Sequence, residues 1–309
     1  MKPSDQAAEL RTELGALSTE QSHPELTDLD GMGTLDLVQA MNREDQKVPA
    51  AIAVVLPRIS AAIDEIAARM AQGGRLVYVG AGTPGRIGVL DASECPPTFG
   101  TDPGLVRGLL AGGEPALRNA VENAEDDAEA GRADLAALGL QPTDSVVGIS
   151  ASGRTPYVLA AIAQAAEAGA FTVGFACNPD SPLGAAAELA LEVELGPEFL
   201  AGSTRLKAGT AQKLVLNLIS TIVMVRLGKT YRNLMVDFQA SNAKLRARSE
   251  RTVMLATDAP AEAAQAALQA AQGSVKTAIL MVLAGVDAAQ ADGLLSRHHG
   301  RLQAALLDS

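Results

Sequence analysis

The chain has 309 residues, of which 48% are hydrophobic and 20% are charged, as in a soluble globular protein of one large and one small domain or of two domains. These proportions exclude disorder and collagen-like repeats. The net charge of −11 repels phosphate backbones and anionic membranes, and the absence of Trp leaves few platforms on which bases could stack. We therefore expect no nucleic acid and no membrane as partners, and an anionic ligand must be bound locally by helix N-termini or by a few Arg and Lys side chains.

The two cysteines, Cys95 and Cys177, show neither a zinc-ligand spacing nor a disulfide framework. The first residues lack the apolar core of a signal peptide. The longest apolar run, Leu214 to Val225, is interrupted by polar residues and is too short to cross a bilayer. We expect a cytoplasmic protein without a metal site.

The chain begins with a polar segment, residues 1–33, which is predicted to lie as an arm on a surface. Two helices follow, one from Thr34 and one from Val48 to Met70. Short apolar runs bounded by glycines then predict strands that alternate with helices. Such alternation predicts an α/β fold with a parallel sheet that is covered on both faces. The predicted strands are Leu76 to Val79, Val106 to Leu110, Ser145 to Ile149, Phe171 to Ala176 and Ala190 to Leu195.

The part of the chain after about Arg248 contains Ala-rich helical runs separated by glycines and no predicted strand. We interpret residues 255–309 as a small helical domain and residues 1–254 as the domain that holds the sheet.

A glycine-rich loop, Gly80 to Gly85, follows the first strand and matches G-x-G-x-x-G. A dinucleotide site is incomplete here, because the helix runs into Glu94 to Gly100, which cannot form the required second strand. A Walker A loop fails because Arg86 stands where its lysine is required. The loop is either a structural turn or an anion-binding helix start. The candidate binding residues are Gly82, Thr83 and Arg86.

A second loop, Ser150 to Thr155, places three hydroxyls and several backbone donors at the start of a predicted helix. Ser and Thr at such positions are often only caps, but one cap needs one hydroxyl. The loop therefore favours a phosphate monoester as ligand. The candidate residues are Ser150, Ser152, Gly153 and Thr155.

Acid and base groups must be carboxylates or lysines, since the three histidines lie near the termini. Glu94 is a candidate because the prolines that follow Cys95 restrict the backbone to a stiff, extended form. Glu125 is a candidate because it lies at the edge of the apolar stripe of a predicted helix, Pro115 to Leu138, where partial burial would raise its pKa. A solvated acidic helix face is the alternative for Glu125.

A third segment, Gly202 to Thr210, again places hydroxyls and cations at a helix start. It suits a substrate carboxylate, and equally it suits ion pairs at an interface. The candidate residues are Ser203, Arg205 and Lys207.

Long ungapped runs of the sequence, spread over nearly the whole chain, match one protein family. The runs are 19–24, 42–45, 80–100, 120–126, 150–156 and 202–220. At these residues the sequence closely resembles the N-acetylmuramic acid 6-phosphate etherases, SIS-domain (sugar isomerase) proteins of bacterial cell-wall recycling.

The resemblance implies an SIS-type three-layer αβα sandwich with a central parallel sheet, a small C-terminal helical domain and a homodimer. It implies Glu94 as the proton donor and Glu125 as the second catalytic glutamate, with no metal or redox cofactor. The family's first loop normally reads Gly-Ala-Gly-Thr-Ser-Gly-Arg, and Pro84 replaces its serine here, so one hydroxyl and one backbone donor are lost.

The implied substrate is N-acetylmuramic acid 6-phosphate, which loses D-lactate from C3 and gains water to give N-acetylglucosamine 6-phosphate. Three alternatives stay open at this point. One is a phosphosugar-binding regulator similar to glucokinase regulatory protein, the second is a phosphosugar isomerase, and the third is a nicotinamide dehydrogenase.

Overall fold

The computed structural model describes residues 11–12, 14–238, 240 and 242–309. Contacts between residues divide the chain into two compact units. The first comprises the described part of Met1–Ala92 together with Gly104–Ile219, and the second comprises Ser93–Pro103 and Ser220–Ser309. The predicted domain division between residues 254 and 255 falls within α10 (Ala243–Thr257) and stays a prediction.

The first unit contains a five-stranded parallel sheet in the order β2-β1-β3-β4-β5. Its strands are β1 (Leu76–Gly80), β2 (Val106–Leu110), β3 (Ser145–Ser150), β4 (Phe171–Ala176) and β5 (Leu189–Glu192). The parallel sheet is confirmed, and only the last strand is displaced from the predicted Ala190 to Leu195. Every residue of β1, β3 and β4 is buried. Continuous burial requires that helices cover both faces, which explains the apolar runs without alternation.

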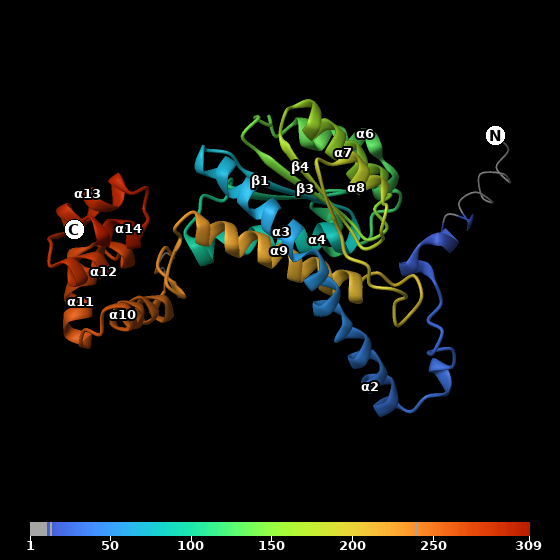
Figure 1. Ribbon diagram of the computed structural model, residues 1–309, viewed down its shortest axis with the longest axis horizontal. Helices are drawn as coiled ribbons and strands as arrows, with labels where there is room; N and C mark the ends of the chain where they lie inside the picture. The colour runs from blue at the N-terminus through green and yellow to red at the C-terminus, as the bar shows by residue number, and fades with distance from the viewer. Residues whose placement is uncertain (1–10, 13, 239, 241) are drawn as a thin grey trace. The chain divides into compact units, whose positions relative to one another are not determined.

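Helices cover both faces of the sheet, as Figure 1 shows, with α6, α7 and α8 on one side and α3 and α4 on the other. Their bounds are α2 (Thr34–Asp45), α3 (Lys47–Ala71), α4 (Gly82–Phe99), α5 (Pro115–Arg118), α6 (Ala128–Ala136), α7 (Pro156–Glu167), α8 (Pro182–Ala186) and α9 (Lys207–Arg226). α7 approaches β3 closely at Gly148, where a Cβ atom would lie 2.7 Å from Ile162 Cγ1. The predicted three-layer αβα sandwich is confirmed.

The helix α9 has the length and the apolar composition that a membrane span would have. In this structure more than half of its most apolar stretch is buried inside the protein. A mostly buried core helix of a soluble protein has the same composition.

The N-terminal segment from residue 14 to residue 33 carries two short 3-10 helices, η1 (Ser18–Glu20) and η2 (Leu29–Gly31). Part of this segment packs into the first unit, because three of its side chains are buried, those of Leu17, Thr19 and His23. The predicted surface arm is thus more deeply packed than its polar composition indicates. Residues 1–10 and 13 of this arm lie outside the described residues.

The second unit has its own apolar core, built largely from the C-terminal helices. These are α10, α11 (Ala261–Ala270), α12 (Val275–Ala284), α13 (Ala288–Arg297) and α14 (Leu302–Leu307). Gly273 and Gly285 separate helices as the sequence predicts, with left-handed φ of 89° and 68°, whereas Gly293 lies inside α13, so the break predicted there was wrong. A short antiparallel pair, β6 (Thr230–Tyr231) and β7 (Leu234–Met235), was not predicted.

Candidate active site

The loops that follow β1 and β3 emerge from neighbouring strands at the carboxyl edge of the sheet. β1 pairs with β2 on one side and with β3 on the other, and its last residue, Gly80, is in register with Ile149. The order of the strands therefore reverses between β1 and β3. Ligands of open α/β sheets bind outside the carboxyl ends of the strands at such a point. The fold thus brings together the two loops that the sequence analysis selected.

The first loop turns directly from β1 into α4, which begins at Gly82. A Cβ atom on Gly85 would lie 2.5 Å from the carbonyl oxygen of Gly80, so the tight turn requires glycine. Gly82 has a left-handed φ of 58°. Thr83 and Pro84 lie in the first turn of α4, where backbone N–H groups have no partner within the helix and a proline is tolerated.

Arg86 uses its guanidinium to fix the segment beyond β2. Its Nε donates to the carbonyl oxygen of Ala116 at 2.9 Å, and its NH2 group donates to that of Asn119 at 3.2 Å. The side chain also lines a cavity of about 240 Å³ beside Gly82. Arg86 therefore shapes the rim of the site through backbone contacts.

The second loop gathers its three hydroxyls around Ser150. Ser150 Oγ lies 2.8 Å from Thr155 Oγ1 and 3.3 Å from Ser152 Oγ, and it accepts a hydrogen bond from Gly153 N at 3.0 Å. Thr155 precedes α7, but its side chain makes no capping hydrogen bond. The cluster is therefore not an ordinary helix cap, and its hydroxyls lie together at the N-terminus of α7, where an anion is favoured.

Glu125 does not lie on a continuous helix, and that prediction was wrong. The predicted helix Pro115 to Leu138 is divided into α5, a 3-10 turn (Ala124–Asp126) and α6. Asn119 is extended and Asn123 has a left-handed φ of 61°, so neither residue continues a helix. Glu125 is exposed, and the expected partial burial is absent.

Glu125 nevertheless lines two cavities. One, of about 510 Å³, is shared with the hydroxyl loop through Ser152, Arg154 and Thr155. The other, of about 240 Å³, is shared with the glycine loop through Gly82 and Arg86. Glu125 is thus common to the cavities beside the two predicted binding loops. Arg154, which the sequence analysis did not select, is a cation on the wall of the larger cavity.

Glu94 lies on α4 and not in the predicted extended segment, so that prediction was also wrong. The helix continues through Pro96 and Pro97 to Phe99. A proline inside a helix removes a hydrogen bond and bends the helix, but it does not always end it. Glu94 is exposed, and it lies about 18 Å of helix rise from Gly82. It belongs to the second unit.

The third candidate segment separates its two cations. Arg205 is exposed and Ser203 is half-buried, whereas Lys207 begins α9 and is 2% exposed. The Lys207 Nζ donates to Glu44 Oε2 at 2.9 Å and to the carbonyl oxygen of Leu195 at 3.0 Å. A substrate carboxylate at Lys207 would have to compete with both partners.

Glu44 is the centre of a buried ionic cluster that the sequence analysis missed. Its carboxylate contacts Lys207, Lys47 at 2.6 Å and His23 Nε2 at 3.2 Å. Burial by itself raises the pKa of Glu44, but hydrogen bonds and positive charge from Lys47 and Lys207 lower it to about 2. His23, which was predicted only as a residue near a terminus, is buried in this cluster.

Glu198, which the sequence analysis also missed, holds the start of α9. Its two carboxylate oxygens accept hydrogen bonds from the backbone N–H groups of Lys207 at 2.9 Å and Ala208 at 3.0 Å. Burial raises the pKa of Glu198, while these two hydrogen bonds oppose that change. The first turn of α9 is therefore occupied by a protein carboxylate. Lys47 lies three residues after Glu44, which indicates only an ordinary helix ion pair. The other partners of Glu44 and those of Glu198 are distant in the chain or depend on the path of a loop.

Cys95 and Cys177 are buried thiols that are not joined in a disulfide. Over the residues that the structure describes, no three His, Cys, Asp or Glu side chains are grouped as metal ligands.

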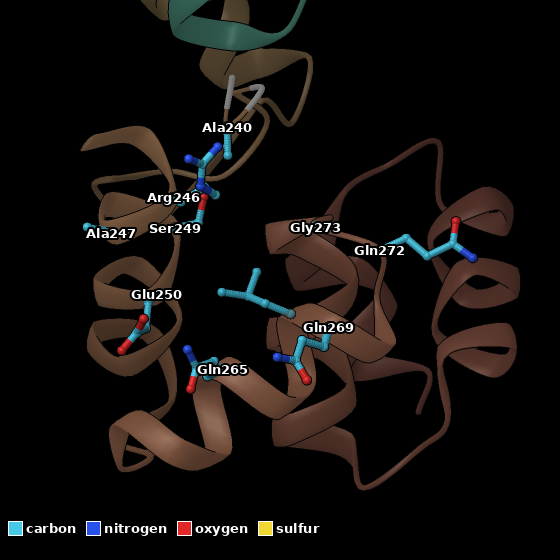
Figure 2. Close-up of a pocket in the computed structure, with 10 residues that line it drawn as sticks. Ala240, Arg246, Ala247, Ser249, Glu250, Gln265, Gln269, Gln272 and Gly273 are labelled. Atoms are coloured by element: carbon cyan, nitrogen blue, oxygen red, sulfur yellow. The ribbon is translucent and has the colours of Figure 1, made fainter. Parts of the chain in front are cut away.

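The second unit contains a separate pocket of about 570 Å³ between α10 and α11. Figure 2 places Arg246 and Glu250 on α10 at one side and Gln265 and Gln269 on α11 at the other. None of the site residues predicted from the sequence lines this pocket. The candidate active site is therefore assigned to the carboxyl edge of the sheet.

The sheet order and its two loops define the class of protein. Residues 123–222 match the SIS domain family, and residues 58–166 match the glucokinase regulatory protein N-terminal SIS domain. A phosphoheptose isomerase from Francisella tularensis has the same fold, with a TM-score of 0.51 and 18% identity over 63% of this chain and 100% of that one. The protein is an SIS-domain protein.

Curated relatives define the family within this class. The chain is 60% identical to an N-acetylmuramic acid 6-phosphate etherase of Streptomyces coelicolor, over 96% of each chain. It is 58% identical to one of Rubrobacter xylanophilus, over 95% of this chain and 97% of that relative. The chain belongs to the N-acetylmuramic acid 6-phosphate etherase family.

The lowered pKa of Glu44 predicts a specific loss of stability in acid. Because the folded-state pKa lies near 2 and the ordinary value is 4.5, the stabilisation is complete above about pH 4.5 and is lost as the pH falls towards 2. We expect the free energy of unfolding of the wild type to fall over this range by up to about 3 kcal/mol more than that of Glu44→Gln. Urea titrations at several pH values measure this difference. The exposed Glu262→Gln is the matched control, and parallel curves for wild type and Glu44→Gln would contradict the prediction.

Proposed function

We propose that the protein cleaves the D-lactyl ether of N-acetylmuramic acid 6-phosphate, with N-acetylglucosamine 6-phosphate and D-lactate as products. The observation that carries the proposal is family membership at 60% identity, together with a carboxylate, Glu125, between a hydroxyl loop and a glycine loop. The reaction belongs to the recycling of bacterial cell wall.

The chemistry requires one base and one acid. In the open-chain sugar the C1 aldehyde acidifies the C2 proton, and the C3 ether lies β to the carbonyl. Removal of the C2 proton expels the lactyl oxygen, which takes up a proton and leaves as lactate. Water then adds to C3 of the unsaturated aldehyde, and a proton returns to C2. The net reaction consumes one water, and neither an oxidant nor a reductant is required.

The loops supply the proposed binding site for the 6-phosphate. Ser150, Ser152 and Thr155 hold their hydroxyls together at the start of α7, and the Gly153 N–H orients the Ser150 hydroxyl by donating to its Oγ. Arg154 lines the same cavity and supplies positive charge. A phosphate that is anchored away from the reacting carbons allows its binding energy to orient C2 and C3.

The glycine loop is proposed to bind the sugar beside Glu125. Gly82 and Thr83 stand at the start of α4, where backbone N–H groups are available, and Arg86 holds the adjacent rim. Pro84 contributes neither a hydroxyl nor an N–H group, so the contacts of this loop must come from its neighbours.

For the lactyl carboxylate we propose Arg205, with the Ser203 hydroxyl near it. Arg205 is exposed, whereas the Lys207 Nζ is already held by Glu44 and Leu195. We therefore propose that Lys207 does not contact the substrate and instead stabilises the start of α9.

Release of D-lactate tests the proposed function. We expect the protein to convert N-acetylmuramic acid 6-phosphate to equal amounts of D-lactate and N-acetylglucosamine 6-phosphate. In water labelled with ¹⁸O the label enters the sugar product at C3 and not the lactate, because the C3–O bond breaks. Enzymatic lactate determination and mass spectrometry measure both results. Binding without turnover, or conversion to a ketose phosphate, would instead identify a regulator or an isomerase.

The two glutamates are proposed to divide the proton transfers, with Glu125 as the base at C2. Glu94 lines neither of the two Glu125 cavities, so we propose that the second subunit of the homodimer supplies it as the acid for the lactyl oxygen. We expect Glu125→Gln to lower the exchange of the C2 proton with deuterium in the solvent by about 10²- to 10⁴-fold, whereas Glu94→Gln retains exchange but loses lactate release. Proton NMR measures exchange and the lactate assay measures turnover. Glu129→Gln, an exposed change on α6, is the matched control. Equal loss of exchange in both variants would refute this division.

We further propose a homodimer that works in the cytoplasm, where a charged sugar phosphate is retained. α2 and α3 each expose large apolar side chains, including Leu35 at 68% and Val54 at 80% exposure. Sedimentation equilibrium is expected to give twice the chain mass of 31.7 kDa, and Val54→Asp is expected to weaken association. A wild-type mass of 31.7 kDa at micromolar concentration would contradict the dimer.

A further inference from the structure

The N-terminal segment of residues 14–23 forms part of the wall of the candidate active site. Leu14 and Leu17 line the cavity of about 510 Å³ that also contains Glu125, Ser152 and Thr155. Leu17 is 5% exposed and anchors the segment, whereas Leu14 is 40% exposed and leaves apolar surface available. The cavity that is proposed to hold a phosphorylated sugar thus has one apolar wall from a distant part of the chain.

A single buried amide, that of Asn178, fastens this wall. Its Oδ1 accepts hydrogen bonds from Ser18 Oγ at 3.0 Å and from Thr19 N at 3.5 Å, and its Nδ2 donates to Thr19 Oγ1 at 3.0 Å. Asn178 is 1% exposed and Thr19 is 0% exposed. The contacts join residues about 160 positions apart, immediately beside Leu17.

The same amide is bonded to the hydroxyl loop. Asn178 Nδ2 also donates to the carbonyl oxygen of Ala151 at 3.0 Å, and that oxygen accepts a second hydrogen bond from Cys177 N at 3.0 Å. Ala151 lies between Ser150 and Ser152. One side chain therefore sets the position of the proposed phosphate loop and of the apolar wall of the same cavity.

Every hydrogen-bonding position of the Asn178 amide is occupied, with two donated and two accepted bonds. A buried amide without partners is costly, so removal of any one partner is expected to destabilise this arrangement. An apolar side chain would fill the same space without fixing the segment to the loop.

We propose that Asn178 is a positioning residue and that the segment it holds determines substrate specificity through Leu14 and Leu17. The inference rests on the proposed function. The apolar wall fits a methyl group of the substrate, which is that of the acetamido group or that of the lactyl group. The wall thus selects an acylated or lactylated amino sugar phosphate over an unsubstituted sugar phosphate, which could use the phosphate loop equally well.

The hydroxyl of Thr19 provides a matched test of the attachment. Thr19→Val keeps the volume but leaves Asn178 Nδ2 with one partner fewer, and Thr19→Ser restores the hydroxyl. We expect Thr19→Val to speed hydrogen exchange of the 14–23 backbone and to raise KM about 5- to 150-fold, the range given by one unsatisfied buried donor. Thr19→Ser and the exposed Thr27→Val are expected to match the wild type in both measurements. Exchange that stays slow in Thr19→Val overturns the assignment of Asn178, and faster exchange with an unchanged KM overturns the role of the wall.

Binding of inorganic phosphate distinguishes the contact of Asn178 with the hydroxyl loop from its contact with the N-terminal segment. Asn178→Ala releases both the Ala151 carbonyl and the segment, so it is expected to weaken phosphate binding and to raise KM. Thr19→Val and Leu14→Ala are expected to raise KM with phosphate affinity unchanged, a difference that a general loss of stability would not produce. Phosphate affinity that is reduced equally in all three variants overturns the proposal.

The inhibition constant of N-acetylglucosamine 6-phosphate identifies the methyl group. In Leu14→Ala this inhibition constant rises if the wall contacts the acetamido methyl. It is unchanged if the wall contacts the lactyl methyl, because the product lacks that group. A Leu14→Ala variant with both KM and this constant unchanged overturns the contact. A wild type that releases no lactate refutes the proposed function, whereas hydrogen exchange and phosphate binding test the positioning role of Asn178 without turnover.

Discussion

The parallel pairing of β1 with β3 is the constraint on which the rest of the structure depends. It aligns Gly80 with Ile149, so that the chain leaves both strands at the same edge of the sheet, and α4 and α7 start there on opposite faces of the sheet (Figure 1). The site is then made by backbone geometry before any side chain is considered. The glycines of the first loop allow the turn, and the hydroxyls of the second surround the start of α7. Glu125 lines cavities beside both loops from a turn that follows the segment bonded by Arg86.

Buried polar groups outside these loops hold the frame of the site. Lys207 is 2% exposed, and such a cation is tolerated only because Glu44 and the Leu195 carbonyl are its partners. Glu198 satisfies the backbone at the start of the same helix. Asn178 performs the equivalent task for the hydroxyl loop. In each case the side chain is hydrogen-bonded within the protein and fixes the position of a neighbouring segment.

The net charge of −11 limits how this protein can bind an anion. Long-range attraction is absent, so a phosphorylated sugar must be held by short-range donors in a confined place. Hydroxyls, helix N-termini and Arg154 provide such donors at the carboxyl edge of the sheet. The apolar wall from the N-terminal segment adds contacts that a bare phosphate does not use. Affinity and selectivity therefore come from different parts of the chain, which Asn178 connects.

The sequence alone determined the strands, the parallel sheet and the two loops, because buried strands and glycine turns depend on neighbouring residues. It also determined the family, since the matching runs cover nearly the whole chain. Only the tertiary structure decided that Glu125 lies on a turn and Glu94 on a helix, because an Asn with positive φ and prolines inside a helix are exceptions to local rules. It also decided that Lys207 is buried against Glu44 and that Thr19 meets Asn178. Those pairs are more than 150 residues apart, and nothing local in the sequence encodes a contact that forms only when distant segments are packed together.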